Sequence, residues 1–434
     1  MTRLLYRICT GLLLLNPLDA QPVATARPTA VDGVDYTSFY PSLLLEHTIP
    51  NAFRKLPKNP VLGPDPGGWD SRDVSDPYVL VTADSVFLFY DGNDDDRYRI
   101  GSAVRDSLGW GWERRGPLFR VGPGRWDSYH QVAPVVIPIG DAWRVYYGGH
   151  VEDSELGYQW GMAEGRGARW RIAPEPVLAL DTTAWDFAGL VYGDIVYLPD
   201  AGRYRLYYTG FQGPLASIGM AESTDGITWE RRSQPVLMQV PGVIAPDVLF
   251  NGREFTMYYV RLVLGQRGRR TEIMRARSVD GVRWEAPEPV LSPDAKWERR
   301  QLMRPNLVYL EGRMMLYYTA GGGRWRIGAA YAEPAFVSRG TWTSTTMPAG
   351  GTALTVAAEV PVGTELDLAV EVGEGRRIPL EWDASGGRRL RPGVTEWRIA
   401  LPQAVRSSGW RVVVAMTSGD GRRSPVVYRM GVAP

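Results

Sequence analysis

The 434-residue sequence contains one cysteine and three histidines, and this scarcity excludes several kinds of site. A lone cysteine, Cys9, cannot form a disulfide within the chain. Zinc sites built from cysteine and histidine are disfavoured as well, because His47, His130 and His150 are the only histidines. Any chemistry must therefore come from oxygen and guanidinium groups, or from histidine used singly.

An excess of either charge is also missing. The chain has 49 Lys and Arg residues against 48 Asp and Glu, a formal net charge of +1. Such a balance gives no global field toward nucleic acid or an anionic surface, so partners must be recognised by a local site. We expect no nucleic acid partner, no cofactor and a monomeric protein.

The sequence has no apolar run long enough to span a bilayer. Its most apolar segment, Ile8–Leu15, follows Arg3 and Arg7, and this pattern resembles a secretory signal with a short hydrophobic core. We predict a signal peptide over residues 1–20 and a secreted or periplasmic protein, with a cytoplasmic location as the alternative. Residues 21–50 show no periodicity and are interpreted as a linker or arm.

Glycine, proline and aromatic residues are plentiful. With 49 glycines, 33 prolines and 11% aromatics, the composition favours many short strands joined by tight turns, an all-β protein. A repeated phrase supports this interpretation, since an aromatic residue is followed eight positions later by proline or glycine. The repeat occurs at Trp69/Pro77, Trp126/Pro134, Trp185/Gly193 and Trp297/Pro305, and Met238/Pro246 is a degenerate copy.

The five copies define five units, and the first four show the pattern of four strands. Units that open at Pro60, Pro117, Pro176, Pro235 and Pro289 predict a five-bladed β-propeller over residues 51–334. The fifth unit lacks a fourth strand, and Asn51–Pro60 is predicted to supply it and close the ring. Residues 335–434 lose the repeat but keep alternating apolar patterns, which predicts a small β-sandwich with an accessory role.

Polar residues that break the repeat are the candidates for function, whereas residues shared by all copies, such as the Trp-Asp pairs, are interpreted as structural. Just before the proline or glycine, the copies read Asp76, Ala133, Tyr192, Ala245 and Arg304. Three residues earlier they read Asp73, His130, Gly189, Gly242 and Gln301, and one residue after the proline or glycine they read Tyr78, Val135, Asp194, Asp247 and Asn306. All three sets are predicted to lie near the propeller axis.

The first copy resembles a known motif. Trp-Asp-x-x-x-Val-x-Asp-Pro, at Trp69–Pro77, is similar to the first blade of five-bladed propeller glycosidases. These comprise the arabinanase and xylosidase family, the invertase and levansucrase families (glycoside hydrolase families 43 and 32) and the related mannoside phosphorylases. The resemblance implies that Asp76 is the general base or nucleophile. It also implies an aspartate in the third blade and a glutamic acid near the first strand of the fourth. The equivalent positions in this sequence are Tyr192 and Ala245, so Asp194 and Asp247, two residues along, are the candidates for the second carboxyl group.

The resulting hypothesis is an exported glycoside hydrolase acting on a poly- or oligosaccharide. Catalysis is assigned to Asp76, Asp247 and Asp194, with Glu152 and Glu155 as reserve acids, because glycoside cleavage needs two carboxyl groups in different protonation states. The substrate-binding candidates are Asp73, Asp91, His130, Tyr192, Gln301, Arg304 and Asn306.

Two alternatives stay open. Phosphorolysis is suggested by Arg304 and by the basic loop Arg261–Arg270, because arginine groups bind phosphate. A non-catalytic sugar-binding propeller is the other. A structural calcium ion in the central channel is compatible with a ring of inward oxygens, although no spacing in the sequence specifies one.

Overall fold

The computed structural model describes residues 21–22, 30–32, 34–35, 42–106, 111–122, 125–140, 142–151, 157–265, 268–383, 385–406 and 408–433. In these ranges the regular structure is β-strand apart from two short 3-10 helices, η1 (Lys296–Glu298) and η2 (Gln403–Arg406). The all-β prediction is confirmed. No helix in the described ranges is long and apolar enough to cross a membrane. The predicted signal segment, including Cys9, lies outside the described residues.

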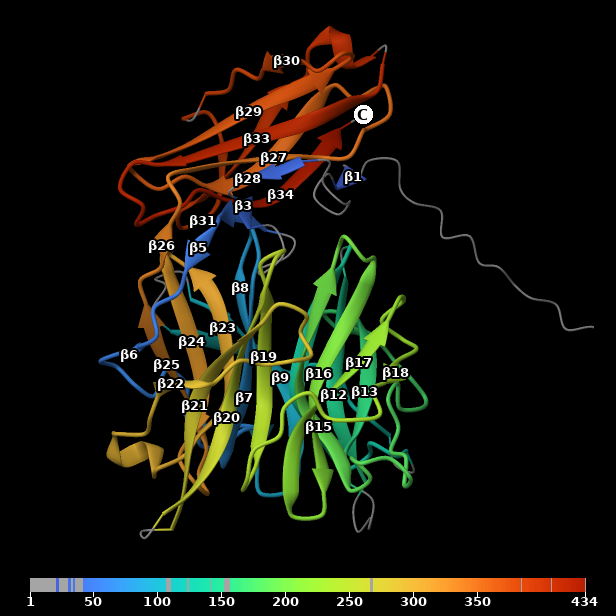
Figure 1. The fold of residues 1–434 in the computed structure, drawn as a ribbon, viewed down its shortest axis with the longest axis vertical. Helices are drawn as coiled ribbons and strands as arrows, with labels where there is room; N and C mark the ends of the chain where they lie inside the picture. Colours follow the sequence, from blue (N-terminus) through green and yellow to red (C-terminus); the bar gives the residue numbers. More distant parts are fainter. Residues whose placement is uncertain are drawn as a thin grey trace, which may run out of the picture.

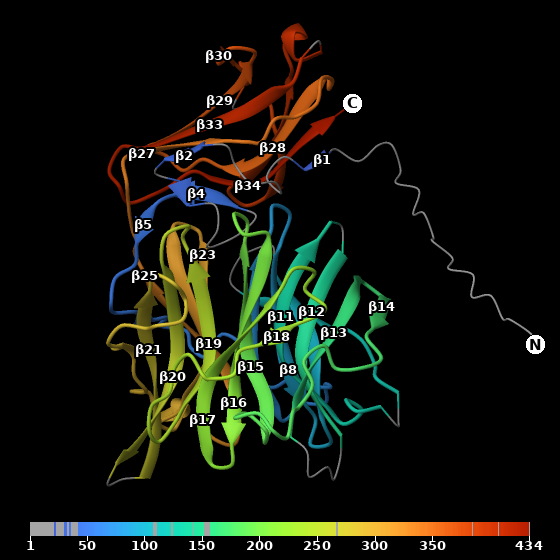
Figure 2. The ribbon, with the colours of Figure 1, turned by 45° about the vertical axis from the view of Figure 1, so that its right-hand side comes forward.

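Five four-stranded antiparallel sheets follow one another along the chain (Figures 1 and 2). Blade 1 contains β7 (Asp73–Val81), β8 (Val86–Asn93), β9 (Tyr98–Arg105) and β10 (Trp112–Pro117). Blade 2 contains β11 (His130–Ile139), β12 (Ala142–His150), β13 (Gln159–Arg166) and β14 (Arg169–Ile172). Blade 3 contains β15 (Gly189–Leu198), β16 (Arg203–Gln212), β17 (Leu215–Ser223) and β18 (Glu230–Arg231). Blade 4 contains β19 (Val243–Phe250), β20 (Phe255–Gly265), β21 (Gly268–Ser278) and β22 (Glu288–Leu291).

Blade 5 closes the ring with a strand from the other end of the propeller sequence. It contains β23 (Leu302–Leu310), β24 (Arg313–Ala320) and β25 (Arg326–Ala332), and its fourth strand is β6 (Arg54–Lys55), which pairs with β25. The first strands β7, β11, β15, β19 and β23 each contact the next, and β23 contacts β7. The predicted five-membered ring and its closing strand are both confirmed.

The recurring Trp-Asp pairs hold each blade together. In blade 1 the hydroxyl of Tyr90 donates to the buried carboxylate of Asp70 at 2.9 Å, and Arg114 of the fourth strand pairs with the same carboxylate at 2.8 Å. The indole of Trp69 lies directly against Gly92, where any larger side chain would clash. In blade 5, Lys55 takes the place of the arginine, with its Nζ 2.7 Å from the buried Glu298. The structural interpretation of this motif is therefore confirmed.

Beyond the propeller, the chain forms two larger antiparallel sheets, drawn in orange and red at the top of Figure 1. One contains β28 (Ala353–Glu359), β31 (Arg388–Arg391), β32 (Val394–Ala400) and β34 (Val426–Ala433), joined by β1 (Gln21–Pro22), β3 (Val34–Asp35) and β4 (Leu43–Leu45). The other contains β2 (Ala30–Asp32), β27 (Arg339–Thr343), β29 (Thr364–Val372), β30 (Arg376–Pro379) and β33 (Trp410–Ser418). Buried side chains from both sheets belong to one hydrophobic cluster.

Segments of residues 21–50 were expected as a linker or arm but contribute strands to these sheets. Leu43, Leu44 and Leu45 are buried, and β4 pairs with β34 near Val426. A second short pair joins β5 (His47–Thr48) to β26 (Ala335–Phe336). The interpretation as a linker is corrected here, because strands this short carry no visible period and are stabilised by partners more than 280 residues away.

The C-terminal sheets cover one end of the propeller. Arg391 donates to the carbonyl of Thr82 at 3.0 Å and Arg429 pairs with Asp84 at 3.0 Å, both at the turn between β7 and β8. The first strand of every blade begins at the opposite end. We call that opposite end, where β7, β11, β15, β19 and β23 start, the entry end; in Figure 1 it faces away from the C-terminal sheets.

Candidate active site at the propeller axis

The residue before the proline or glycine has the same unusual backbone in all five blades. Each lies in the left-handed region and at a β-bulge between the first and second strands. The φ values are 52° at Asp76, 56° at Ala133, 46° at Tyr192, 56° at Ala245 and 46° at Arg304. Such a conformation is unfavourable for residues with a side chain, and bulges reorient the residue they contain. The five positions are therefore structurally equivalent, as the repeat predicted.

The bulge frees a backbone N–H that the preceding blade must satisfy. Asp76 N–H donates to Thr319 Oγ1 at 2.7 Å, and Ala245 N–H donates to Thr209 Oγ1 at 2.8 Å. In blade 2, however, Ala133 N–H donates to both carboxylate oxygens of Asp91 at 3.0 Å. Asp91 thus occupies a position where two other blades have threonine. A threonine hydroxyl is sufficient to accept this bond, so the carboxyl group of Asp91 indicates that the residue has a second role.

Asp91 is the neighbour of Asp76. The two residues lie on β8 and β7, where Ser75 is the register partner of Asp91 and the bulge places Asp76 next to it. Their carboxyl groups share a hydrogen bond, and they are 7% and 1% exposed. Burial raises the pKa of Asp76, an increase that the bond from Asp91 and the charge of Arg304 oppose. Burial, together with the Asp76 charge, raises the pKa of Asp91 well above its ordinary value.

This pair can hold one proton between two carboxyl groups. Two like charges in contact cannot both persist in a buried site, so one carboxyl stays protonated while the other is ionised. The raised pKa of Asp91 makes it the protonated member, which leaves Asp76 as the carboxylate. The first blade therefore presents an acceptor whose protonation is set by its neighbour.

Arg304 provides the countercharge. Its side chain is fully buried and donates to the carbonyls of Pro134 at 3.1 Å and Pro246 at 3.4 Å, two blades that do not adjoin each other. Its positive charge lowers the pKa of Asp76, Asp91, Asp194 and Asp247, although burial outweighs it in each case. The expectation that Arg304 contacts substrate or phosphate stays a prediction, and in the structure its guanidinium is enclosed by protein.

A guanidinium thus lies where the sequence allowed a calcium ion. In the part of the chain that the structure describes, no group of three or more His, Cys, Asp or Glu side chains is arranged to hold a metal. The central acids are instead balanced by Arg304 and by backbone donors.

Asp194, Asp247 and Asn306 form joints between neighbouring blades. Asp194 accepts the N–H of Val248 at 2.8 Å, Asp247 accepts that of Leu307 at 3.0 Å, and Asn306 accepts that of Val79 at 2.7 Å. The three residues are equivalent in the repeat, and each acceptor reaches the next blade. Asp247 also accepts a bond from the Asn306 amide at 2.9 Å. The common geometry gives these side chains a structural task.

The pKa values of Asp194 and Asp247 are nevertheless both raised by their surroundings. Burial raises the pKa of Asp194 to about 6. Burial, followed by the charge of Asp194, raises that of Asp247 to about 8. At neutral pH Asp247 is therefore mainly protonated and Asp194 mainly ionised. From the sequence each was a candidate to act with Asp76, a reaction that needs two carboxyl groups in different protonation states.

The residues three positions earlier hold blades 1, 2 and 5 together at the entry end. Asp73 accepts the Trp325 N–H at 2.8 Å and the Tyr98 hydroxyl at 3.2 Å. His130 Nδ1 accepts the Tyr98 N–H at 3.1 Å, and burial lowers the His130 pKa to about 4. His130 is thus neutral, with its proton on Nε2. Gln301 is half-buried just before β23.

Aromatic side chains surround this cluster. Tyr98, Tyr158, Tyr192 and Phe211 pack around Ala133 and its neighbours, and all four are half-buried. The rings of His130 and Tyr129 lie 4.1 Å apart, centre to centre. Flat apolar faces beside hydrogen-bonding groups are the usual lining of sugar sites. Of these rings, Tyr98, Tyr158 and Phe211 escaped the sequence comparison because they lie outside the compared positions: Phe211 is in a second strand, Tyr98 in a third strand and Tyr158 just before one. Glu152 and Glu155 lie outside the described residues.

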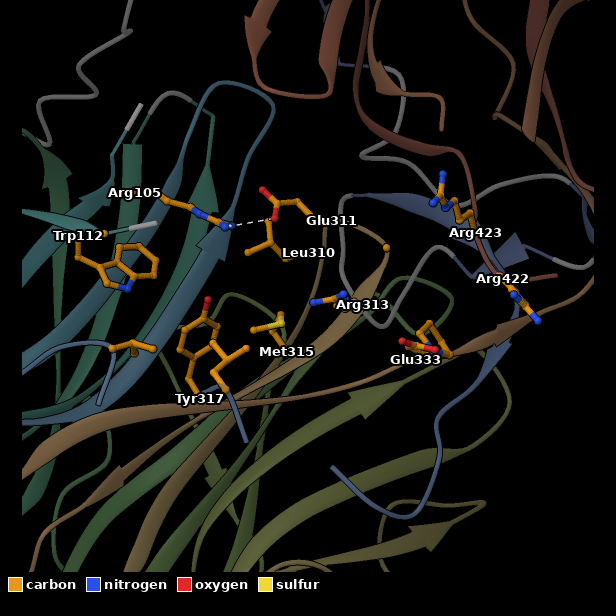
Figure 3. A pocket seen from close by; sticks show the side chains of 15 residues that line it. Arg105, Trp112, Leu310, Glu311, Arg313, Met315, Tyr317, Glu333, Arg422 and Arg423 are labelled. Atoms are coloured by element: carbon orange, nitrogen blue, oxygen red, sulfur yellow. Dashed lines mark hydrogen bonds and ion pairs between the residues drawn. The ribbon is translucent and has the colours of Figure 1, made fainter. Parts of the chain in front are cut away.

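A cavity of about 820 Å³ lies elsewhere, between blade 1, blade 5 and the C-terminal sheets (Figure 3). Its lining includes Trp112, Tyr317 and the ion pair of Arg105 with Glu311 at 3.2 Å. Glu311 sits at the turn between β23 and β24, at the opposite end of β23 from Arg304. The cavity is therefore separate from the axial cluster.

Comparisons with known proteins identify a relative of this chain and solved structures that share its propeller fold. No family model matches the sequence. The sequence is 30% identical over 243 residues to the uncharacterized protein Rv1502 of Mycobacterium tuberculosis. The aligned region covers 51% of this chain and 80% of that protein.

Among solved structures, one from the GH130 family of mannoside phosphorylases, which contains glycoside hydrolases that target β-1,2-mannosidic linkages in Candida mannan, matches with a TM-score of 0.53. It is 17% identical and covers 64% of this chain and 93% of that one. A thermostable family-43 glycoside hydrolase matches with a TM-score of 0.50 at 15% identity, over 65% of this chain and 93% of that one. The resemblance drawn from Trp69–Pro77 is confirmed at the level of fold.

Proposed function

The chain belongs to the family of the uncharacterized Mycobacterium tuberculosis protein Rv1502. From its propeller fold and its axial carboxyl groups we propose that it is a carbohydrate-active enzyme that cleaves a glycosidic bond. Asp76 is the reacting carboxylate, acting as general base or nucleophile. The observation that carries this proposal is the Asp76–Asp91 pair, a buried carboxylate whose protonation is controlled by a neighbouring acid.

The pair suits proton transfer at a sugar. Asp76 is the only carboxylate among the five bulge positions, and its bulge turns it out of the regular alternation of β7. Half-buried aromatic rings beside it supply faces on which a sugar ring can stack. Burial strengthens the electrostatic interaction of Asp76 with developing positive charge, because little water competes.

Hydrolysis requires a second group to protonate the leaving oxygen. Asp247 and Asp194 are the candidates, since they are buried, have pKa values of about 8 and about 6, and belong to the same central ring. Both residues also form hydrogen bonds between neighbouring blades, so an experiment must separate this structural role from the role of general acid. Substrates with activated leaving groups do not need the acid and restore the activity of a variant that lacks it, whereas they do not restore a lost contact between blades.

Phosphorolysis is the second candidate, and one observation favours it. Asp76 and Asp91 share a hydrogen bond, so they lie closer together than the roughly 5 Å or more that separates the two carboxyl groups of glycoside hydrolases. A hydrogen-bonded pair acts as one acid–base unit. Phosphate is already a nucleophile and needs no base, so one such unit is sufficient for its attack.

The test uses purified full-length protein and a panel of aryl furanosides and pyranosides, with and without inorganic phosphate. Release of the aryl group without phosphate indicates hydrolysis, and release only with phosphate indicates phosphorolysis. Asp76→Asn keeps the shape and removes the charge, so turnover should fall about a hundredfold or more with little change in stability. Near-normal turnover by Asp76→Asn would refute the assignment. Binding of sugars without any turnover by the wild type would favour a sugar-binding propeller.

Export and the accessory role of the C-terminal sheets are further parts of this proposal. Arg3, Arg7 and the apolar run Ile8–Leu15 support cleavage of a signal peptide near residue 20. The shared hydrophobic cluster of the two C-terminal sheets supports a β-sandwich. N-terminal sequencing of the protein recovered from culture medium or periplasm tests export, because an intact Met1 would contradict it.

A further inference from the structure

Exposed apolar side chains gather on one side of the entry end. Among the described residues, five of the large hydrophobic side chains that are most open to water lie there, all on blades 3 and 4. They are Phe187 (43% exposed), Leu215 (44%), Met238 (69%), Val240 (86%) and Leu264 (69%). We call this set the blade 3–4 rim. Single exposed apolar residues are ordinary, but a group of them marks an interaction surface.

The segments that carry the rim residues lie next to one another. Leu262 donates its N–H to the carbonyl of Gly242 at 3.0 Å, and the side chains of Ala216 and Leu262 both lie against Gly242. These contacts join the turn that carries Leu215, the segment that carries Val240 and the hairpin that carries Leu264. On the other side, Phe211 pairs with Ala216 and bridges to Phe187. Phe211 and Tyr192 both pack against the buried cluster around Ala133, so the rim runs into the axial cluster.

Blade 4 departs from the repeat where the rim is most exposed. In blades 1 to 3 a tryptophan packs flat against a glycine of the second strand, as Trp185 does against Gly210. In blade 4 the equivalent residues are Met238 and Arg261. The side chain of Arg261 occupies the position that must be empty for the tryptophan to pack, and Met238 lies in water. Such a departure lowers the stability of the blade. In a repeat protein it therefore indicates that this blade has a function beyond the common structure.

Positive charge accompanies these apolar residues. Strands β20 and β21 have 11 residues each, longer than the corresponding strands of other blades, and their hairpin extends from the entry end (Figures 1 and 2). Among its described residues the hairpin carries Arg261, Arg269 and Arg270. Arg261 and Arg270 both pair with a single acid, Glu272, at 2.8 and 2.9 Å. This is a local excess of positive charge in a chain whose net charge is +1.

We infer that the blade 3–4 rim binds the headgroup region of a lipid bilayer that contains anionic lipid. Apolar side chains that reach into the interface, flanked by arginines that attract the negative surface, are the combination that interfacial binding requires. A second copy of the chain fits less well, because a symmetric contact would place the arginines of one hairpin against those of the other. The inference is independent of glycoside cleavage. Membrane binding would nevertheless affect glycoside cleavage, because a sugar carried by a membrane lipid would lie next to Tyr192.

Sedimentation with vesicles tests the inference. Full-length protein is mixed with vesicles of phosphatidylcholine alone or with vesicles that also contain phosphatidylglycerol, at low and high salt. Binding is expected to the anionic vesicles and to weaken with salt. Leu264→Ser and Val240→Ser should each lower the partition coefficient about tenfold, because each removes one inserted apolar side chain. Arg269→Gln should lower it about fivefold.

Val362→Ser is the matched control. Val362 is 90% exposed but lies between two strands of the C-terminal sheets, so its replacement should leave vesicle binding unchanged. Absence of binding to anionic vesicles would overturn the inference, as would equal loss in the control. A dimer that light scattering detects in the wild type and that Leu264→Ser abolishes would overturn it in favour of a second copy. Each variant is compared by circular dichroism, and all are expected to fold because the replaced side chains are exposed.

Discussion

Replacing Asp91 by threonine removes one carboxyl of the axial pair but keeps the bond that Asp91 shares with blade 2. Threonine occupies the equivalent position in blades 3 and 5, where Thr209 and Thr319 accept the bulge N–H at 2.8 and 2.7 Å. Asp91→Thr should therefore still accept from Ala133 and should fold normally. The variant separates a structural acceptor from a group that sets the protonation of Asp76.

The expected change follows from the contacts of Asp76. In the wild type, protonated Asp91 stabilises the Asp76 carboxylate through a hydrogen bond, which lowers the pKa of Asp76. Loss of a bond to a charged group costs about 1.5–3 kcal/mol, which corresponds to a rise of roughly one to two pH units in the pKa of Asp76. Because a base must be deprotonated to act, the acidic limb of the kcat/KM profile should move to higher pH by that amount.

The assay is the pH dependence of kcat/KM for wild type and Asp91→Thr, on a glycoside that the wild type cleaves. Melting temperature is measured alongside and should change little. An unmoved acidic limb with unchanged kcat/KM would refute the reasoning, because Asp91 would then serve only as the acceptor for Ala133. A fall in melting temperature with an unmoved limb would point to the same conclusion.

Three further outcomes are expected. Asp247 has a folded pKa of about 8, above its unfolded value, so its contribution to stability is present at low pH and is lost as pH rises from about 4 through 8. Asp247→Asn should flatten this decline in urea unfolding, and an unchanged pH dependence would contradict the assignment. Lys55→Met leaves the buried Glu298 without its cation and should cost about 3 kcal/mol, measured by thermal unfolding, while exposed Lys58→Met should be silent. Leu44→Ala should destabilise the C-terminal sheets by about 2–5 kcal/mol, detected as faster proteolysis, and a silent result would restore the interpretation of this segment as a linker.

Much of the propeller was accessible from the sequence because its signals are local and repeated. The spacing from Trp69 to Pro77 recurs in each unit, and Tyr90 follows at a fixed distance, so strand order and blade count could be derived by comparing the copies. The same comparison aligned the residues before the proline or glycine, which share one backbone conformation in all five blades. The closing strand within Asn51–Pro60 followed from one missing strand in the last unit.

The central charges were less accessible. Asp194 and Asp247 were identified as unusual carboxylates, but their bonds to Val248 and Leu307 depend on the angle at which neighbouring blades meet. Arg304 was placed near the axis, yet its enclosure depends on how five strands fill a common space. Alternation along a strand predicts which face a side chain occupies, whereas a bulge changes that face locally.

The sequence alone determined the all-β class, the five units and the first-blade motif around Asp76, because strand period, turn residues and repeat spacing are properties of neighbouring residues. Only the tertiary structure decided which inward groups meet. The contact of Asp76 with Asp91 arises from the register of β7 and β8 combined with a bulge, and the enclosure of Arg304 arises from ring closure. The strand at Leu43–Leu45 exists because β34, almost 400 residues away, supplies its hydrogen-bonding partner. Interactions between distant segments leave no period in the sequence, and the electrostatics of the site depend on them.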